Sequence, residues 1–119
     1  MPGARMRRVN EAVREVISAH ISGDLKDPRI GFVTVTGVET SPDLRSARVF
    51  VSVLGEQPQR DDALAGLRSS AGFLQAQLAR EVRMKRTPTL DFVYDDSVDT
   101  GMRITELLDE GEHPSEPPT

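Results

Sequence analysis

The sequence predicts one α+β domain in which helices cover one face of a three-stranded sheet. Apolar residues recur every three or four positions in two stretches, and at every second position in shorter stretches between and after them. The predicted order is helix, strand, strand, a kinked pair of helices, strand and a short final helix. Helices on a single face of the sheet are the economical solution for this order. The chain of 119 residues is long enough for one such core.

The first helix is expected over Arg5–Ile21. Its apolar stripe has helical spacing and consists of Met6, Val9, Val13, Val16, Ile17, His20 and Ile21. Gly23 then ends the helix, as glycine commonly does. His20 lies at the edge of the stripe without an accompanying nucleophile or carboxylate motif. We therefore interpret it as a packing or surface histidine and not as a catalytic base.

Two strands that form an antiparallel hairpin are expected next. Ile30–Glu39 is rich in valine and threonine, which favours a strand. Ser41-Pro42-Asp43 has the composition of a turn. Apolar residues then alternate with other residues from Ala47 to Val53, which indicates a strand with one packed face.

A helical stretch is expected to begin at about Asp61, after a loop, and to run to about Arg86. Ser69-Ser70-Ala71-Gly72 interrupts it, because glycine disfavours a helix interior and serine competes for backbone hydrogen bonds. This break predicts a kink between two tandem helices. Thr87-Pro88 ends the second helix, and a third strand follows over Leu90–Asp95. The helical crossover permits parallel pairing with the second strand.

The C-terminal part is expected to contain a short helix and a tail. Ser97 can cap the helix, which would contain Met102, Ile104, Leu107 and Leu108. Residues 109–119 are acidic, with three prolines and no apolar anchor, so they predict a disordered tail. The folded domain is thus expected to comprise residues 1–108.

Composition argues against several classes of function. The absence of cysteine rules out thiolate catalysis and cysteine zinc sites, and 4% aromatic residues argue against base stacking as the main binding device. No membrane-spanning run or signal peptide is recognisable, so we expect a cytoplasmic protein. No nucleotide-binding or zinc-protease motif is present, and Asp95, Asp96 and Asp99 lack the spacing of a calcium loop. We therefore expect no cofactor, no metal and no enzymatic activity.

Charge is distributed unevenly along the chain. Residues 1–90 hold 14 Lys/Arg against 10 Asp/Glu, a balance of +4, whereas residues 91–119 hold 1 Arg against 9 Asp/Glu, a balance of −8. The basic part favours a polyanionic partner. A solvated surface with an acidic solubilising tail would explain the same asymmetry.

Two basic clusters and the helix break are the candidate binding residues. The first cluster is Arg5, Arg7, Arg8 and Arg14, and the second is Arg80, Arg83, Lys85 and Arg86. In the second, a spacing of three would place the arginines on or near one helix face. Such side chains suit phosphate contacts or solubilise exposed helices. Ser70, Ala71 and Gly72 could let another backbone approach and expose a helix N-terminus, or serve only the crossing of two helices.

The sequence resembles the ribosome-binding factor A family over about residues 5–108. The most specific stretch is Asp27-Pro28-Arg29-Ile30-Gly31, followed by Val33-Thr34-Val35-Thr36. Further matching positions are Ser41, Asp43, Leu44, Ala47, Val49, Pro88, Leu90, Phe92, Asp95, Ser97, Gly101, Met102 and Ile104. The resemblance implies a type II KH-like fold. It also implies that a kink, typically Ala-x-Gly, replaces the usual glycine-rich loop, and here Ser70, Ala71 and Gly72 take those positions.

The resemblance further implies binding to the immature 30S ribosomal subunit and its 16S rRNA. The protein would assist late maturation, including processing of the 16S rRNA 5′ end, and would matter most at low temperature. Its mechanism would be non-covalent stabilisation of one rRNA arrangement, with a ribosome-maturation GTPase as an implied partner. Nothing in the sequence suggests an obligate dimer. The competing hypotheses are a protein-interaction adaptor acting through the acidic C-terminal segment, and an acid–base enzyme using Asp95, Asp96 or His20.

Overall fold

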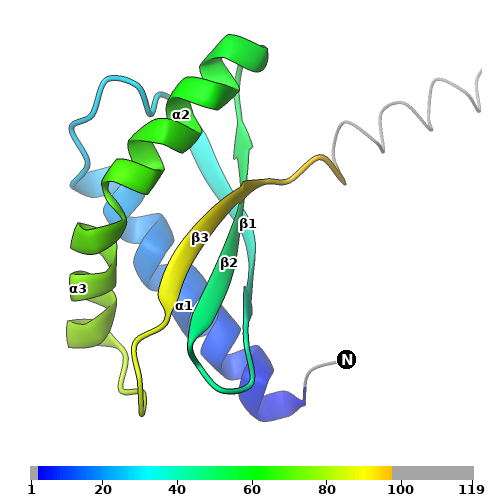
Figure 1. Cartoon of the computed structure of the whole chain (residues 1–119), viewed down its shortest axis with the longest axis vertical. Helices are drawn as coiled ribbons and strands as arrows, with labels where there is room; N and C mark the ends of the chain where they lie inside the picture. Colours follow the sequence, from blue (N-terminus) through cyan, green and yellow to red (C-terminus); the bar gives the residue numbers. More distant parts are fainter. Residues whose placement is uncertain (1–2, 98–119) are drawn as a thin grey trace, which may run out of the picture.

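Three helices pack on one face of a three-stranded sheet in the computed structural model, which describes residues 3–97 (Figure 1). The elements follow the order α1 (Ala4–Gly23), β1 (Val33–Thr40), β2 (Ser46–Val53), α2 (Gln57–Ser69), α3 (Ala71–Glu81) and β3 (Thr89–Tyr94). This order and the α+β class confirm the fold expected from the periodicity. The final helix beyond Ser97, and the tail at 109–119, lie outside the described residues.

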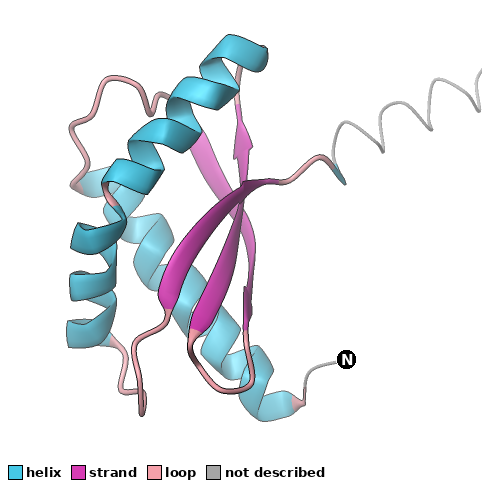
Figure 2. Cartoon of the chain, viewed as in Figure 1, coloured by secondary structure: helices cyan, strands magenta, loops and turns pink. Residues whose placement is uncertain are grey.

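The sheet is mixed and has the strand order β1-β2-β3 (Figure 2). β1 pairs antiparallel with β2, as the hairpin turn predicts, and β2 pairs parallel with β3, which the helical crossover permits. The side chains of β2 that face the helices and are buried are Ala47, Val49, Val51 and Val53. The residues between them face the other side of the sheet. We call that other side, which no described helix covers, the open face.

The core lies between the sheet and the three helices. Val13, Ile17 and Ile21 of α1 are buried at helical spacing, as the sequence predicts. α2 contributes Leu67, and α3 contributes Leu74 and Leu78. Phe92 of β3 is the largest side chain with no exposure. Along residues 3–97, no helix is both long and apolar enough to cross a membrane.

The second helix begins at Gln57, earlier than the expected start near Asp61. The Gln59 side chain accepts a hydrogen bond from the Glu56 backbone N–H over 2.9 Å, which satisfies one of the donors left at a helix start. Pro58 fits the first turn because its fixed φ is helical and its missing N–H has no partner there. Asp61 therefore lies inside the helix and is not in its first turn.

The third helix ends at Glu81, and the expected end near Arg86 is wrong. Val82 has extended backbone angles, with φ −119° and ψ 123°. Leu74 and Leu78 point into the core, and the same stripe continued would reach Lys85, whose charge is costly to bury. Arg83, Lys85 and Arg86 consequently lie on the connection to β3 and share no helix face with Arg80.

Candidate nucleic-acid interface

Members of both basic clusters line one groove. The β1–β2 turn forms part of its wall, and Figure 1 shows this turn at the end of the molecule where α1 begins. The volume of the groove is about 730 Å³. The start of α1, the β1–β2 turn and the α3–β3 connection form its walls, with Arg5, Met6, Val9, Pro42, Asp43, Leu44, Lys85 and Arg86 as lining residues. We call this the basic groove. Tertiary structure thus joins Arg5 to Lys85 and Arg86, which are distant in sequence.

The groove carries three cations and one carboxylate. Within residues 3–97, no ion pair joins Arg5, Lys85 or Arg86 to a carboxylate. Asp43 is engaged in the turn, where its Oδ1 accepts the Ser41 hydroxyl over 2.7 Å and the Arg45 backbone N–H over 3.0 Å. These bonds, with that from Ser41 the largest cause, hold the pKa of Asp43 below its ordinary value. The groove is net positive, so it suits a phosphate backbone.

The other basic residues are arranged differently from the sequence prediction. Arg7, Arg8, Arg80 and Arg83 are exposed and do not line the groove. Arg14 is half-buried, and its Nε donates to Glu11 over 3.0 Å. The ion pair with Glu11 occupies the Arg14 guanidinium and leaves it less available to a phosphate.

The break between α2 and α3 is a one-residue kink at Ser70, as expected. Ser70 has φ −93° and ψ 0°, and its N–H donates to the carbonyl oxygens of Gly66 and Leu67 over 3.1 and 3.0 Å. Its own carbonyl accepts the Leu74 N–H over 3.0 Å. Hydrogen bonding therefore continues across the kink, so the two tandem helices change direction without a loop.

Gly72 is exposed beside this kink, and its surroundings are open. A Cβ added at Gly72 would meet no atom of a neighbouring element within 4 Å among the described residues. The interpretation that this glycine serves only the crossing of the two helices is therefore wrong. The open surface leaves room for the backbone of another molecule to approach.

Gly66 is a glycine that the packing between elements requires, and sequence reasoning missed it. A Cβ there would lie 2.8 Å from Ile30 Cγ1 and 3.4 Å from the Asp27 carboxyl carbon. Gly66 is buried on α2, and Ile30 is buried against it from the α1–β1 connection. The only sequence signal was indirect, since Asp27 and Ile30 belong to the stretch with the strongest family resemblance.

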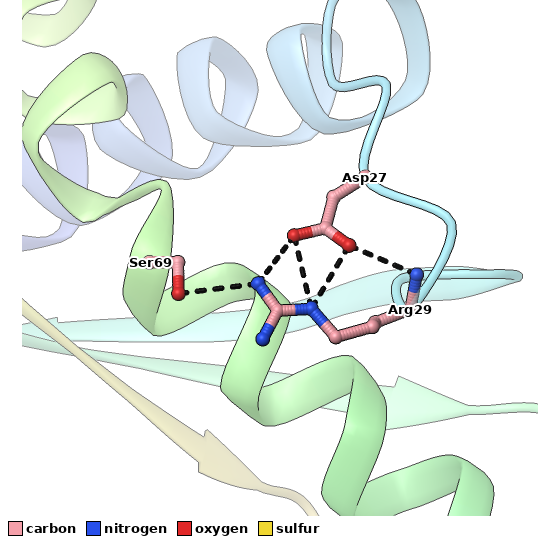
Figure 3. A network of polar contacts seen from close by, with 3 residues as sticks. All are labelled: Asp27, Arg29 and Ser69. Atoms are coloured by element: carbon pink, nitrogen blue, oxygen red, sulfur yellow. Dashed lines mark hydrogen bonds and ion pairs between the residues drawn. The ribbon is translucent and has the colours of Figure 1, made fainter.

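A polar network fastens the α1–β1 connection to the residue before the kink (Figure 3). Arg29 Nη2 donates to Asp27 Oδ2 over 2.6 Å and to Ser69 Oγ over 3.2 Å, and the Arg29 backbone N–H donates to Asp27 over 2.9 Å. The Arg29 guanidinium, followed by that backbone bond, lowers the pKa of Asp27 to about 2. Arg29 thus positions the last turn of α2 through its hydrogen bond to Ser69. The sequence alone did not predict this role for Arg29.

His20 joins the ends of α1 and α3. Its Nδ1 contacts the Asp24 carboxylate and its Nε2 contacts the Glu81 carboxylate, while its ring meets Phe73 edge-on at 6.1 Å. The Glu81 bond is the largest cause that raises the pKa of His20, and the Asp24 bond is the second. The packing role expected for His20 agrees with this position. The sequence showed no carboxylate motif beside His20, but the structure places two carboxylates there: Asp24, one helical turn further along the chain, and Glu81, which is distant in sequence.

Replacing His20 by glutamine is expected to remove part of the pH dependence of stability. The folded state binds the proton of His20 more tightly than the unfolded chain does, so this stabilisation is complete below the unfolded pKa near 6.5 and is lost as pH rises through the folded pKa. We expect less than about 1 kcal/mol, because both carboxylates are about half exposed. Urea unfolding at pH 6 and pH 9 would measure it. Equal losses in the wild-type and His20→Gln proteins would contradict the role.

The fold is that of a KH-like domain of type II, in which the kink at Ser70 joins α2 and α3 directly. The family model for ribosome-binding factor A matches residues 5–108. The chain therefore belongs to the ribosome-binding factor A family.

Individual relatives agree with this assignment. Ribosome-binding factor A of Anaeromyxobacter sp. (strain K) is 52% identical over 107 residues, which are 89% of this chain and 78% of that protein. The crystal structure of ribosome-binding factor A from Thermus thermophilus is similar with a TM-score of 0.68 and 31% identity, covering 75% of this chain and 94% of that chain. A Thermus thermophilus homology model fitted into a cryo-electron-microscopy map of a 30S complex has a TM-score of 0.58 and 32% identity, covering 81% and 97%.

Proposed function

We propose that this chain binds the immature 30S ribosomal subunit through its 16S rRNA. The observation that carries the proposal is the convergence of Arg5, Lys85 and Arg86 on one groove without carboxylate partners among residues 3–97. The fitted 30S complex of the Thermus thermophilus protein supports the choice of partner. The protein works as a monomer in the cytoplasm, where subunits are assembled.

The basic groove supplies affinity for the phosphate backbone. Each cation that neutralises a phosphate releases a condensed counterion, so binding weakens as salt rises. Such contacts fix position and carry little sequence information. The groove is also lined by the apolar side chains of Met6, Val9 and Leu44. This lining favours an RNA strand whose sugars also contact the protein. The positive surface extends outward from the groove through four exposed arginines, Arg7, Arg8, Arg80 and Arg83. Arg14 adds to this surface when its guanidinium exchanges Glu11 for a phosphate.

The kink supplies a second contact at Ser70, Ala71 and Gly72. α3 starts at Ala71, directly after the kink residue Ser70. Gly72 leaves the start of α3 open to a backbone. A ligand that reaches both the kink and the basic groove must have a defined shape, so the two contacts select a folded RNA over an extended one.

Binding of one rRNA arrangement shifts the population toward it, since a ligand stabilises only the state that it prefers. In this way the protein assists late maturation of the 30S subunit, including processing of the 16S rRNA 5′ end. Misfolded rRNA arrangements exchange more slowly in the cold, so this cold-adaptation role is greatest at low temperature. A ribosome-maturation GTPase would act on the bound complex. No chemical step on the RNA is assigned to this chain.

Sedimentation of cell lysate containing the full chain tests this function. The protein is expected to co-migrate with free small subunits and to be absent from assembled ribosomes, because release follows maturation. A lysate from cold-grown cells should show a larger bound fraction. Protein that stays at the top of the gradient at low salt, where phosphate contacts are strongest, would contradict the proposal. The alternative adaptor function depends on residues outside those described.

A further inference from the structure

Leu44 has a backbone conformation that leucine rarely adopts. Its φ is 62°, and among residues 3–97 it is the one residue other than glycine with a positive φ. In this left-handed region the Cβ of an L-residue lies too close to the following carbonyl oxygen, a clash that glycine avoids and asparagine tolerates. A bulky side chain at such a position indicates strain, which persists only where the surrounding structure holds it.

The hydrogen bonds of the β1–β2 turn hold this conformation. The Leu44 N–H donates to the Ser41 carbonyl over 2.9 Å, and the Ser41 N–H donates to the Ser46 carbonyl over 2.8 Å. Asp43 Oδ1 accepts the Arg45 backbone N–H over 3.0 Å. A four-residue turn with serine first and proline second commonly has glycine fourth. The turn therefore requires a positive φ at residue 44, but it does not require a leucine there.

Packing against the core does not explain the leucine either. Leu44 is half-buried, and within residues 3–97 it is not one of the partly buried apolar side chains that pack against the hydrophobic core. Val9, which lines the same groove, does pack against that core. Leu44 instead lines the basic groove together with Lys85 and Arg86. The strained residue thus lies at the place where the positive charges converge.

We propose that Leu44 is a binding residue, which the turn holds in its strained conformation so that the side chain contacts the sugars of an RNA in the basic groove. The inference rests on the proposed function, because it assigns a further contact to the same site. Phosphate contacts act through charge and weaken as salt rises. Contact with leucine removes apolar surface from water and does not depend on charge. Leu44 therefore supplies a part of the affinity that salt does not remove.

Asparagine at this position separates the binding role from a structural one. It is close to leucine in size, tolerates the left-handed conformation and lacks the apolar surface. The free Leu44→Asn protein is expected to unfold at a urea concentration no lower than the wild type does, because relief of strain offsets the lost packing of a half-buried side chain. Its affinity for 30S subunits is expected to fall about threefold or more, since apolar contact is lost and an amide is placed against it.

Titration of purified 30S subunits with the full chain at several salt concentrations measures this contact. The loss in Leu44→Asn should be the same at every salt concentration, so that its plot of log affinity against log salt runs parallel to that of the wild type. Leu44→Met keeps an apolar side chain of similar volume and should retain most of the affinity. The matched control is Leu54→Asn, which removes a 75% exposed leucine from outside the groove and should bind as the wild type does.

Three results would overturn the proposal. They are wild-type affinity of Leu44→Asn, an affinity loss that disappears as salt rises, and a clear fall in the urea midpoint of Leu44→Asn, which would show that the free protein needs the leucine. The variant Lys85→Ala/Arg86→Ala separates this proposal from the proposed function. If that variant binds more weakly and Leu44→Asn does not, the groove binds RNA without Leu44. If neither variant binds more weakly, the groove is not the binding site and both proposals fail.

Discussion

Replacing Lys85 and Arg86 by alanine is expected to weaken binding to small ribosomal subunits and to flatten its salt dependence. Both side chains line the basic groove and have no carboxylate partner among residues 3–97. Loss of two phosphate contacts should lower the slope of log affinity against log salt by about 2. At low salt we expect roughly a tenfold loss of affinity, from exposed charge pairs of about 0.2–1 kcal/mol each.

Adding Arg5→Ala should lower the slope by about one further unit, because Arg5 reaches the same groove from α1. Titration of purified 30S subunits at several salt concentrations would measure both effects. The matched control is Lys26→Ala/Arg48→Ala, which removes two exposed positive charges from outside the groove. If the control and the groove variant changed the slope equally, binding would depend on net charge and not on the groove.

Local sequence patterns predicted most of the fold because the hydrophobic periodicity of each element agrees with the structure that it adopts. The α1 stripe of Val13, Ile17 and Ile21 and the alternation in β2 each follow from one periodicity. The kink at Ser70 was predictable for the same reason, since glycine and serine disfavour a continuous helix at that point. The crossover length permitted the parallel pairing of β2 and β3 that the structure shows, but did not require it.

The candidate site was predictable in composition but not in geometry. The second cluster was expected on one helix face, and the end of α3 at Glu81 places Lys85 and Arg86 on a connection instead. Their meeting with Arg5 depends on the packing of α1 against α3 and the β1–β2 turn, which no local pattern records. The contacts of Arg29 with Ser69 and of His20 with Glu81 are likewise long-range. Pairs of this kind are invisible to a single sequence.

Replacing Gly66 by valine is expected to destabilise the domain by about 1–3 kcal/mol, the usual cost of overpacking a well-packed site. Its Cβ would lie 2.8 Å from Ile30 Cγ1, and the Asp27 carboxylate is the next neighbour. The α1–β1 connection would have to move away from α2, which would stretch the bond from Arg29 to Ser69. Urea unfolding monitored by circular dichroism would measure the loss.

Gly72→Val is the matched control for this prediction. It makes the same substitution in the neighbouring helix, where an added Cβ meets no other element among the described residues, and valine has a higher helix propensity than glycine. We therefore expect its stability to equal or slightly exceed that of the wild type. Similar losses in both variants would show that valine in these helices, and not the collision with Ile30, is responsible.

A double variant would attribute the loss at Gly66 to its cause. Ile30→Ala alone should cost about 2–5 kcal/mol, because Ile30 is buried. Combined with Gly66→Val, it removes the side chain that collides with the new methyl groups and leaves space for them. The two costs should then sum to more than the loss of the double variant, with a coupling of at least about 0.5 kcal/mol. Strict additivity would mean that Gly66 is required for something other than the approach of Ile30.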